Sequence, residues 1–463
     1  MLTVLFQGSS QPPRSAFLSC TVNNGHDMLD MIHAHGAQPK NARSVQSLPI
    51  DNRGTMLCPE LVYEILTYCL SDTTLNTFFP NLFPWYLKHI CRSWRSVFIS
   101  SPRFWNRLTF EASMADAFET DRFKCALTLV ELCIRCTKDQ PFSFRFNAEA
   151  YSYFVATSYM YRTMKTIVAH ADRWSAAYVE VKGFKGVEEL LLKAKHRFGQ
   201  LRTLQISVPR GMLCHLDLYE DAPNLTRVYT TDYYRLRWSR ITVLHIDFSC
   251  CTDIIIITEL DKMTCLEELV IRRLPFRRDA QPTPVEIPSL KTLYVEHHYP
   301  LSLIRAPSLE SLHLGDVISF QQTAIAEAFL RRVSHLQTIS LDGSASSIFD
   351  FTPGLDHLII IDEVLTLRAF ETLVHHPVAS SLKTIIIDAG RYRCDPRVLY
   401  RITNLIEKHQ FPNLRCLSVH IYDDGEKDTS FDIDDLVRQG ANKGFEVYVT
   451  FSPLQIMPPF GDL

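Results

Sequence analysis

Short runs with apolar residues at their first, fourth and sixth positions recur along the chain, as at Leu201, Leu204 and Ile206. Apolar residues two apart lie on the same face of a strand, so each run predicts a strand with one buried face. The runs begin at Val187, Leu201, Leu225, Ile241, Leu266, Leu290, Leu309, Leu336, Leu355, Leu382 and Leu414. Spacings of about 14 to about 32 residues leave room for a loop or for a helix between strands.

Residues 57–108 carry a different, helical pattern. Leu61, Val62, Ile65 and Leu66 form a broad apolar stripe that predicts a helix starting near Pro59, where a first-turn proline is tolerated. A second helical run covers 87–98 and ends before Pro102. About 50 residues cannot bury so many large side chains alone, so we expect this segment to pack on the rest of the chain and on another protein.

Helix and strand signals also alternate between the two regions. Helices are predicted at 116–136 and 150–170, and strands at 142–146 and 178–181. Further helices are predicted at 323–333, 365–375 and 396–409, and 445–451 is predicted to be the closing strand. The expected fold class is α/β, a solenoid of stacked strands forming a parallel, concave sheet.

The third, fifth and seventh positions of each predicted strand face the concave side. They comprise Tyr229, Thr231, His245, Asp247, Val270, Arg272, Tyr294, Glu296, His313 and Asp342. Aromatic and basic side chains of this kind are typical of protein-binding surfaces, although any solenoid has a polar concave face. The candidate target-binding residues are Tyr229, His245, Arg272, Arg273, Tyr294 and His313. Ile359, Ile361 and Ile386 are apolar at such positions, so we expect the tail 453–463 or a partner to cover them.

Three short motifs stand out between residues 57 and 105. They are Leu57-Cys58-Pro59-Glu60-Leu61 with Ile65-Leu66, then Ile90-Cys91-Arg92-Ser93-Trp94-Arg95, then Ser101-Pro102-Arg103-Phe104-Trp105. Together these motifs resemble an F-box of the fungal type. The chain departs from the family at 71–86, a longer and phenylalanine-rich connection. Any amphipathic helical hairpin is the alternative. The later strands resemble the irregular leucine-rich repeats of fungal F-box proteins.

This resemblance implies a substrate-recognition subunit of a ubiquitin ligase, bound to a Skp-family adaptor and through it to a cullin. It implies adaptor contacts at Leu57, Pro59, Leu61, Ile65, Leu66 and the partly internal Trp94. The repeats would hold a target protein of unknown identity, and the chain itself would catalyse nothing. The alternatives are a non-degradative scaffold bound to the adaptor, and an enzyme that uses a cysteine.

Composition and charge limit the partners and the cellular compartments that we expect. The 463 residues have a net charge of −3, which does not favour nucleic acid as a partner. No apolar run has transmembrane length and no secretory signal is evident, so we expect a cytoplasmic or nuclear protein without membrane contact. Thirteen cysteines, among them Cys69, Cys91 and Cys265 at apolar-pattern positions, are expected to be buried thiols in a reducing compartment.

Four parts of the chain are therefore expected. Residues 1–55 form a flexible arm, in which 1–8 resemble the remnant of a protease-cleavable tag, and 56–110 form the F-box. Residues 111–451 form the solenoid with its linking helices, and 452–463 form a proline-rich tail.

Signals for site chemistry are weak. Cys133 and Cys136 form a lone C-x-x-C pair in a predicted helix, which favours core positions over zinc ligands. Two adjacent histidine pairs, at 297–298 and 375–376, lack metal-ligand spacing, and the acidic run 423–435 lacks the calcium-loop pattern. One basic group is expected either to meet along an edge and bind acidic or phosphorylated segments, or to form a solvated rim: Arg272, Arg273, Arg277, Arg278, His297, His298 and Arg305. The sequence predicts no cofactor or metal.

Overall fold

The structure is a computed structural model. It describes residues 57–70, 73–80, 84–112, 119–149, 154–182, 186–207, 217–231, 234–247, 259–273, 284–297, 299–315, 320–342, 346–361, 370–388, 405, 411–423, 437–438, 440–442 and 444–453. The chain divides into two units, 1–58 and 59–463, and the fold below is that of the second. The predicted arm 1–55 and the tail beyond Pro453 lie outside the described residues.

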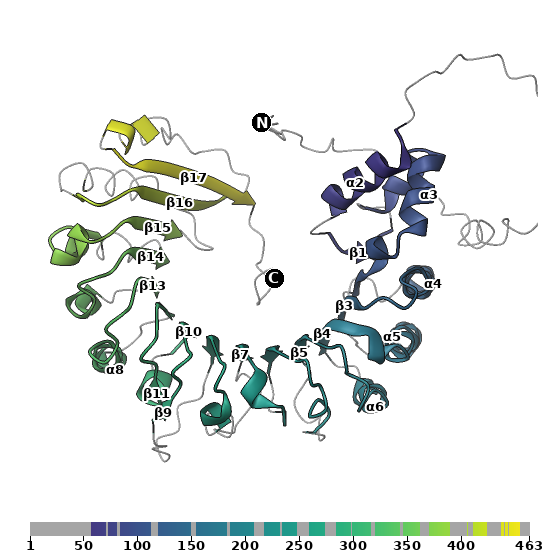
Figure 1. The fold of residues 1–463 in the computed structure, drawn as a ribbon, viewed down its shortest axis with the longest axis horizontal. Helices are drawn as coiled ribbons and strands as arrows, with labels where there is room; N and C mark the ends of the chain where they lie inside the picture. The colour runs from purple at the N-terminus through teal and green to yellow at the C-terminus, as the bar shows by residue number, and fades with distance from the viewer. Residues whose placement is uncertain are drawn as a thin grey trace, which may run out of the picture. The chain divides into compact units, whose positions relative to one another are not determined.

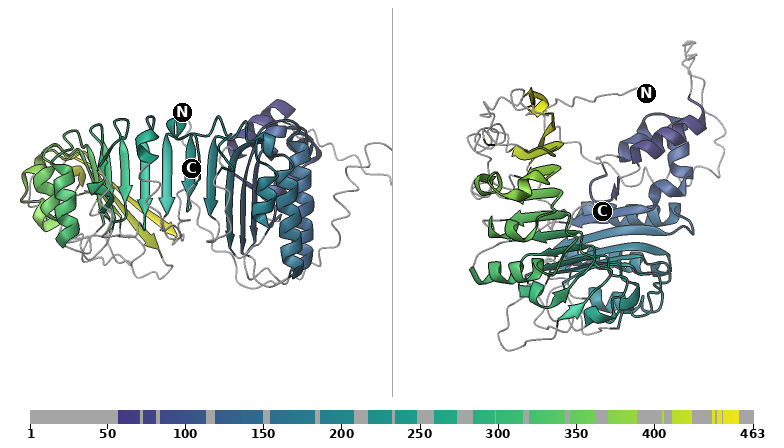
Figure 2. Two further views of the ribbon diagram at one scale, coloured as in Figure 1. Left: turned by 90° about the horizontal axis from the view of Figure 1, so that it is seen from below. Right: turned by 60° about the vertical axis from the view of Figure 1, so that its left-hand side comes forward.

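A single parallel sheet of fifteen strands runs through the second unit, with its strands in chain order (Figure 1). Its strands are β1 (Leu75–Asn76), β2 (Arg107–Ala112), β3 (Phe142–Glu149), β4 (Trp174–Lys182), β5 (Thr203–Ser207), β6 (Arg227–Thr230), β7 (Val243–Asp247), β8 (Glu268–Arg272), β10 (Thr292–Val295), β12 (Ser311–Leu314), β13 (Thr338–Asp342), β14 (His357–Ile361), β15 (Thr384–Asp388), β16 (Cys416–Asp423) and β17 (Glu446–Pro453). Figure 2 shows these strands side by side and pointing the same way. Two short strands, β9 (Val285–Glu286) and β11 (Ile304–Arg305), pair with each other in a second sheet.

The helices that cover the curved sheet lie on its outer side, whereas α2 and α3 lie at its N-terminal end (Figure 1). The α-helices are α2 (Pro59–Leu70), α3 (Arg92–Ser100), α4 (Thr120–Cys136), α5 (Phe154–Val168), α6 (Val187–Leu192) and α8 (Phe320–Leu330). The 3-10 turns are η1 (Trp85–His89), η2 (Pro102–Trp105), η4 (Ala171–Arg173), η5 (Trp238–Arg240), η6 (Leu260–Lys262), η7 (Tyr299–Ser302), η8 (Ser346–Phe351) and η9 (Pro377–Ser380). Among the described helices, α4, α5, α6 and α8 pack outside the curve and none covers the opposite face, here called the inner face (Figure 1).

The predicted repeat is confirmed in its register. Its fourth positions form one hydrogen-bonded row across the sheet from Leu204 on β5 to Leu417 on β16, and every member is buried. The first and sixth positions from Leu201 onwards are buried as well. Stacked apolar positions therefore build one continuous core between the sheet and its outer covering, as a solenoid-like α/β fold requires.

The first predicted run is an exception, because residues 187–192 form helix α6 instead of a strand. Val187, Leu190 and Leu191 are its buried residues, with the i, i+3, i+4 spacing of a helix face. Gly186 precedes the helix with a φ of 97°, a left-handed conformation that suits glycine. The strand prediction at this place was wrong.

The other helix predictions agree where the structure describes them. The helices expected at 116–136 and 150–170 are α4 and α5, and the one expected at 323–333 is α8, shifted by about three residues. Residues 370–373 are helical, while 362–369 lie outside the described residues, as do 396–404 and 406–409 of the next predicted helix. The closing strand is β17.

Aromatic rings join the first repeats to one another. Phe144 meets Trp174 with ring centroids 4.7 Å apart, and Trp174 lies 5.5 Å from Phe198. Phe198 continues to Tyr219 at 5.0 Å, and Tyr219 to Tyr234 at 5.6 Å. Burial raises the pKa of the Tyr219 hydroxyl. This ladder of large buried rings fixes the first half of the sheet more firmly than aliphatic contacts alone.

Candidate functional site

Trp85 anchors the helical segment to the first strand of the sheet, and Trp105 packs against Trp85. Trp85 Nε1 donates a hydrogen bond to the carbonyl oxygen of Asn76 on β1 at 2.7 Å. Trp105 Nε1 donates to the carbonyl oxygen of Phe98 at 2.9 Å, and the two indoles meet edge to face with centroids 6.0 Å apart. Both rings are buried. The helical segment of α2, α3 and η2 therefore has an aromatic core of its own.

The outer side of α2 is apolar and exposed. Leu61 and Tyr68 have 52% and 86% of their surface exposed, and Ile65 between them is also exposed. Spacings of four and three residues put these side chains on one helix face, here called the α2 stripe. Val62 and Leu66 occupy the buried face of the same helix.

Exposed apolar side chains concentrate in this part of the chain. Seven of the nine large apolar side chains that are exposed among the described residues lie between 57 and 99. They are Leu57, Leu61, Ile65, Tyr68, Tyr86, Ile90 and Ile99. Such a concentration is typical of a surface that another protein covers.

Most of the residues predicted to contact an adaptor are accessible. Pro59, Leu61 and Ile65 are exposed, as is Leu57 in the preceding unit, and Trp94 is half-buried. Leu66 is the exception, with 0% of its surface exposed. It lies four residues after Val62 on the buried face of α2, so it supports the helix from within and does not reach its surface.

The thiols differ from the expectation of buried cysteines. Cys69, Cys91 and Cys265 are exposed, whereas Cys133 is buried. Cys91 stands at the N-cap of α3 and Cys265 in the turn before β8, both positions outside the apolar face of an element.

A small cavity separates the end of α2 from the first strands. It has a volume of about 90 Å³, and its lining includes Thr67, Thr73, Arg103, Phe104 and Arg107. The two threonine hydroxyls are buried and lack a hydrogen-bond partner among the described residues. The volume is small for an organic ligand, so the cavity is read as a feature of the helix–sheet junction.

One row of side chains crosses the inner face from strand to strand. Register pairs place four predicted target-binding residues in it, in the order Tyr229, His245, Tyr294 and His313, with Val270 between the second and third. The whole row reads Thr109, Arg145, Tyr178, Gln205, Tyr229, His245, Val270, Tyr294, His313, Ser340, Ile359, Ile386, Ser418 and Tyr448.

Tyr229 is enclosed within this row. Its ring meets His245 edge to face with centroids 4.4 Å apart, and only 2% of its surface is exposed. Burial raises the pKa of Tyr229 to about 12. The predicted role of Tyr229 in direct target contact conflicts with this burial, although the strand pattern directs its side chain to the inner face.

His245 and His313 are half-buried and flank a shared carboxylate. His245 Nε2 lies 2.7 Å from Glu268 Oε1, and the hydrogen bond from His245 lowers the pKa of Glu268. Burial lowers the pKa of His313, with the charge of Glu268 acting in the opposite direction. His313 Nε2 lies 3.1 Å from Ser311 Oγ, while Glu268 bonds to the other histidine. The centre of the inner face is thus a packed cluster of polar and aromatic groups.

Other predicted inner-face residues are covered or paired. Thr231, Asp247 and Val270 are buried, and Glu296 accepts a hydrogen bond from the Arg273 amide at 3.1 Å. The side chain of Asp342 lies outside the described residues, and Ile359, Ile361 and Ile386 are half-buried.

Among the described members of the predicted basic group, the arginines have separate partners or belong to separate sheets. Arg272 on β8 stacks over Tyr294, with its guanidinium carbon 5.6 Å from the ring centre. Arg273 lies 3.8 Å from the carboxylate of Asp247. Arg305 belongs to β11 in the separate two-stranded sheet. Arg277, Arg278 and His298 lie outside the described residues.

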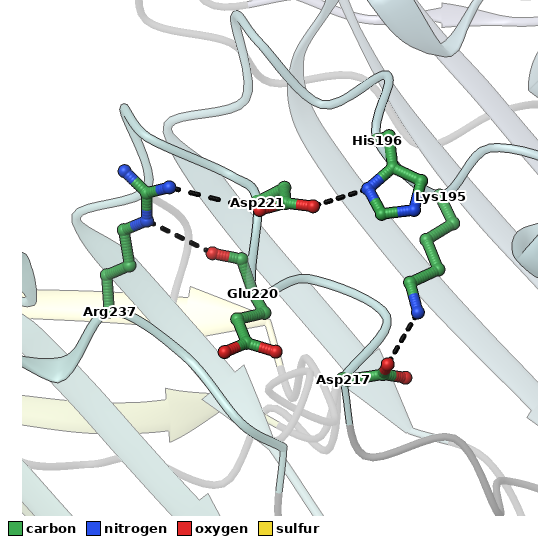
Figure 3. Close-up of polar contacts among 6 residues, drawn as sticks. All are labelled: Lys195, His196, Asp217, Glu220, Asp221 and Arg237. Atoms are coloured by element: carbon green, nitrogen blue, oxygen red, sulfur yellow. Dashed lines mark hydrogen bonds and ion pairs between the residues drawn. The ribbon is translucent and has the colours of Figure 1, made fainter.

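A cluster of ion pairs occupies the outer loops between α6 and η5. Lys195 Nζ bonds to Asp217 at 2.5 Å, and Asp221 bonds to His196 while lying 3.9 Å from Arg237 (Figure 3). The cluster joins loops of successive repeats, and its members are exposed or half-buried. Because solvent screens such exposed pairs, the cluster contributes little to the stability of the contact between repeats.

Neither a metal site nor a membrane-spanning helix is found in the described part of the chain. Cys133 is buried in α4 and burial raises the pKa of Cys136, as expected for core positions, and no group of three metal-ligating side chains occurs among the described residues. Among the same residues, no helix has the length and apolar character that crossing a bilayer requires.

Three arginines on the inner face were missed by sequence reasoning. The three are Arg107 on β2, Arg145 on β3 and Arg227 on β6, at strand positions that face away from the core and onto the inner face. The alternation Phe142-Ser143-Phe144-Arg145-Phe146 carried the signal for one of them, because it directs the arginine away from the core.

No protein-family model matches this chain, and no curated protein matches it significantly. Function is therefore inferred from the geometry above and from the sequence resemblance.

Proposed function

We propose that the chain is the substrate-recognition subunit of a Skp–cullin–F-box ubiquitin ligase, with an F-box at 56–110 followed by leucine-rich repeats. The α2 stripe and its exposed neighbours dock on the Skp-family adaptor, and the inner face of the sheet holds the target. The chain makes no covalent bond itself. It raises the effective concentration of a target lysine near the charged conjugating enzyme.

The observation that carries this proposal is the exposed apolar surface on the same residues that resemble an F-box. Burying an apolar side chain of this size stabilises a complex by about 1.5–3 kcal/mol when it is fully exposed beforehand. Three half-exposed or fully exposed side chains on α2 alone therefore offer several kcal/mol to a partner. A tyrosine in the stripe adds a rigid anchor of the kind that dominates protein interfaces.

Co-expression with a Skp-family adaptor tests the proposal. The wild-type chain is expected to co-purify with the adaptor, and the double variant Leu61→Asp/Ile65→Asp is expected to lose it, because two carboxylates would be desolvated in the interface. Tyr448→Asp is the matched control, since Tyr448 on β17 is exposed to the same 52% as Leu61. Circular dichroism of each variant reports folding.

Two results would overturn it. One is a folded wild-type chain that does not bind the adaptor. The other is a double variant that binds as well as the wild type. Accumulation of captured targets after proteasome inhibition separates a degradative receptor from an adaptor-bound scaffold.

A further inference from the structure

The small cavity at the end of α2, here called the junction cavity, is rich in groups that can donate hydrogen bonds. Its lining includes Thr67 on α2, Thr73 just before β1, Arg103 on η2, and the residues Asn106 and Arg107. Hydroxyl, amide and guanidinium groups are all donors, and a guanidinium is always charged. No carboxylate is among the described residues of the lining. The donors and the sign of the charge therefore suit an anion.

Thr67 does not use the partner that its own helix offers. A threonine inside a helix can donate its hydroxyl proton to the carbonyl four residues earlier, and Thr128 on α4 does so with the carbonyl oxygen of Lys124 at 3.1 Å. The hydroxyl of Thr67 is buried and has no hydrogen-bond partner among the described residues. Because its own helix does not satisfy it, this hydroxyl is available to a ligand in the junction cavity.

Thr73 brings a second hydroxyl of the same kind. Its oxygen is also buried without a hydrogen-bond partner among the described residues, whereas Thr77, four residues later, donates to the carbonyl oxygen of Thr109 at 3.1 Å. A buried hydroxyl that stays unpaired destabilises a fold. Two such groups around one cavity indicate that a hydrogen-bond acceptor belongs there.

Arg103 supplies the charge. It forms no ion pair with any described residue. It is also exposed, so it borders both the junction cavity and the solvent. Arg107 lines the same cavity but already interacts with other residues, so we count only Arg103 as a cation for the ligand. A fixed positive charge repels metal ions and attracts an anion.

The size of the junction cavity limits that anion. Its volume is about 90 Å³, which corresponds to about three waters at ~30 Å³ each. A single tetrahedral oxyanion such as inorganic phosphate has a similar size, whereas a nucleotide or a sugar phosphate is several times larger. Its four oxygens can also accept hydrogen bonds from donors that arrive from different directions.

We propose that the junction cavity binds one inorganic phosphate ion. Arg103 neutralises its charge, and Thr67 and Thr73 donate hydrogen bonds to its oxygens. These residues come from η2, from α2 and from the segment before β1, so the bound ion joins the end of α2 to the start of the sheet. The inference is independent of the proposed receptor function.

Thermal unfolding of the full chain in sodium phosphate tests the proposal, with sodium chloride of the same ionic strength and pH as the reference. A ligand that binds only the folded chain raises Tm as its concentration rises, so phosphate should raise Tm above the chloride series. Isothermal titration calorimetry measures Kd. Arg103→Gln should weaken phosphate binding by roughly tenfold or more, because it removes a charge-assisted contact.

Valine variants test the two hydroxyls. Thr67→Val and Thr73→Val keep the branched shape and remove the donor, so without phosphate each should be at least as stable as the wild type. Each should weaken phosphate binding by roughly tenfold. Thr163→Val is the matched control, because the Thr163 hydroxyl on α5 is also buried without a hydrogen-bond partner among the described residues but does not line the cavity. This control should keep the full response to phosphate.

Several results would overturn the inference. One is a Tm that rises no further in phosphate than in chloride, which would mean that the cavity holds water alone. Another is unchanged phosphate binding in Arg103→Gln and the two cavity valine variants, or a loss of binding in Thr163→Val.

O-phosphoserine separates the free ion from a phosphorylated side chain, which carries the same group. Inorganic phosphate is expected to bind more tightly, because the volume of the junction cavity leaves no room for an attached chain. Tighter binding of O-phosphoserine would overturn the assignment to the free ion.

Discussion

Leu61 and Leu66 lie five residues apart on α2, yet one has 52% of its surface exposed and the other none. The sequence does not distinguish them, because both are apolar positions of one helical pattern. Only the packing of the helix shows that some of these positions are buried and that others are exposed. An apolar position in a sequence therefore does not reveal whether the chain or a partner covers it.

Alanine substitutions should separate these two halves. Leu66→Ala is expected to lower the free energy of unfolding by about 2–5 kcal/mol, because it leaves a cavity in a closed core. Leu61→Ala should change it by no more than about 0.5 kcal/mol. Urea unfolding measures both. Equal losses would show that Leu61 is part of the core.

The burial of His313 makes the stability of the fold depend on pH. Burial lowers the pKa of His313 below its ordinary value of 6.5, so the folded chain binds this proton less readily than the unfolded chain. Stability is then lost as the pH falls below about 6.5 towards the folded pKa. His313→Gln should lose less thermal stability than wild type between about pH 7.5 and about pH 5.5. A larger loss in the variant would contradict the assigned direction.

At the scale of elements, one predicted strand proved to be a helix, whereas the other predicted strands and the described helices follow the sequence pattern. The apolar first, fourth and sixth positions recur often enough to fix the register of most strands, and burial confirms them. Residues 187–192 were mistaken because a six-residue run fits both a helix and a strand period. Gly186 and the acidic pair that follows Val187 were the signals for a helix start.

Contacts between elements could not be predicted from the sequence. Arg145 and Tyr178 meet although they are 33 residues apart in the chain. Their pairing depends on the register of β3 against β4, which shifts by one residue at its start. The strand pattern assigns each side chain to a face of the sheet but does not say which residue lies opposite, so the contact between Arg145 and Tyr178 was not predicted.

A glycine at the end of β12 tests how tightly neighbouring strands pack. A Cβ on Gly315 would lie 2.8 Å from the Cα of Glu296, a backbone atom that cannot turn aside. Gly315→Ala is expected to cost roughly 1–3 kcal/mol in urea unfolding. Gly354→Ala is the control, because a Cβ there meets nothing within 4 Å. A neutral Gly315→Ala would indicate a looser junction.

At the scale of the molecule, an incomplete surface should make stability depend on the partner. If the adaptor covers the exposed apolar residues of 57–99, it binds the folded chain and not the unfolded chain. At a concentration one hundred times Kd the complex should gain about 2.7 kcal/mol. Differential scanning calorimetry with increasing adaptor should show a rising Tm, and the Leu61→Asp/Ile65→Asp variant should show no rise.

The chain-order sheet has a consequence for synthesis. Each main-sheet strand hydrogen-bonds to the one made just before it, so a nascent chain can add strands one at a time as it leaves the ribosome. Helix α2 emerges before any of these strands. Its apolar outer side is therefore exposed for the longest time during synthesis, so a chaperone or a partner subunit could bind it before translation is complete.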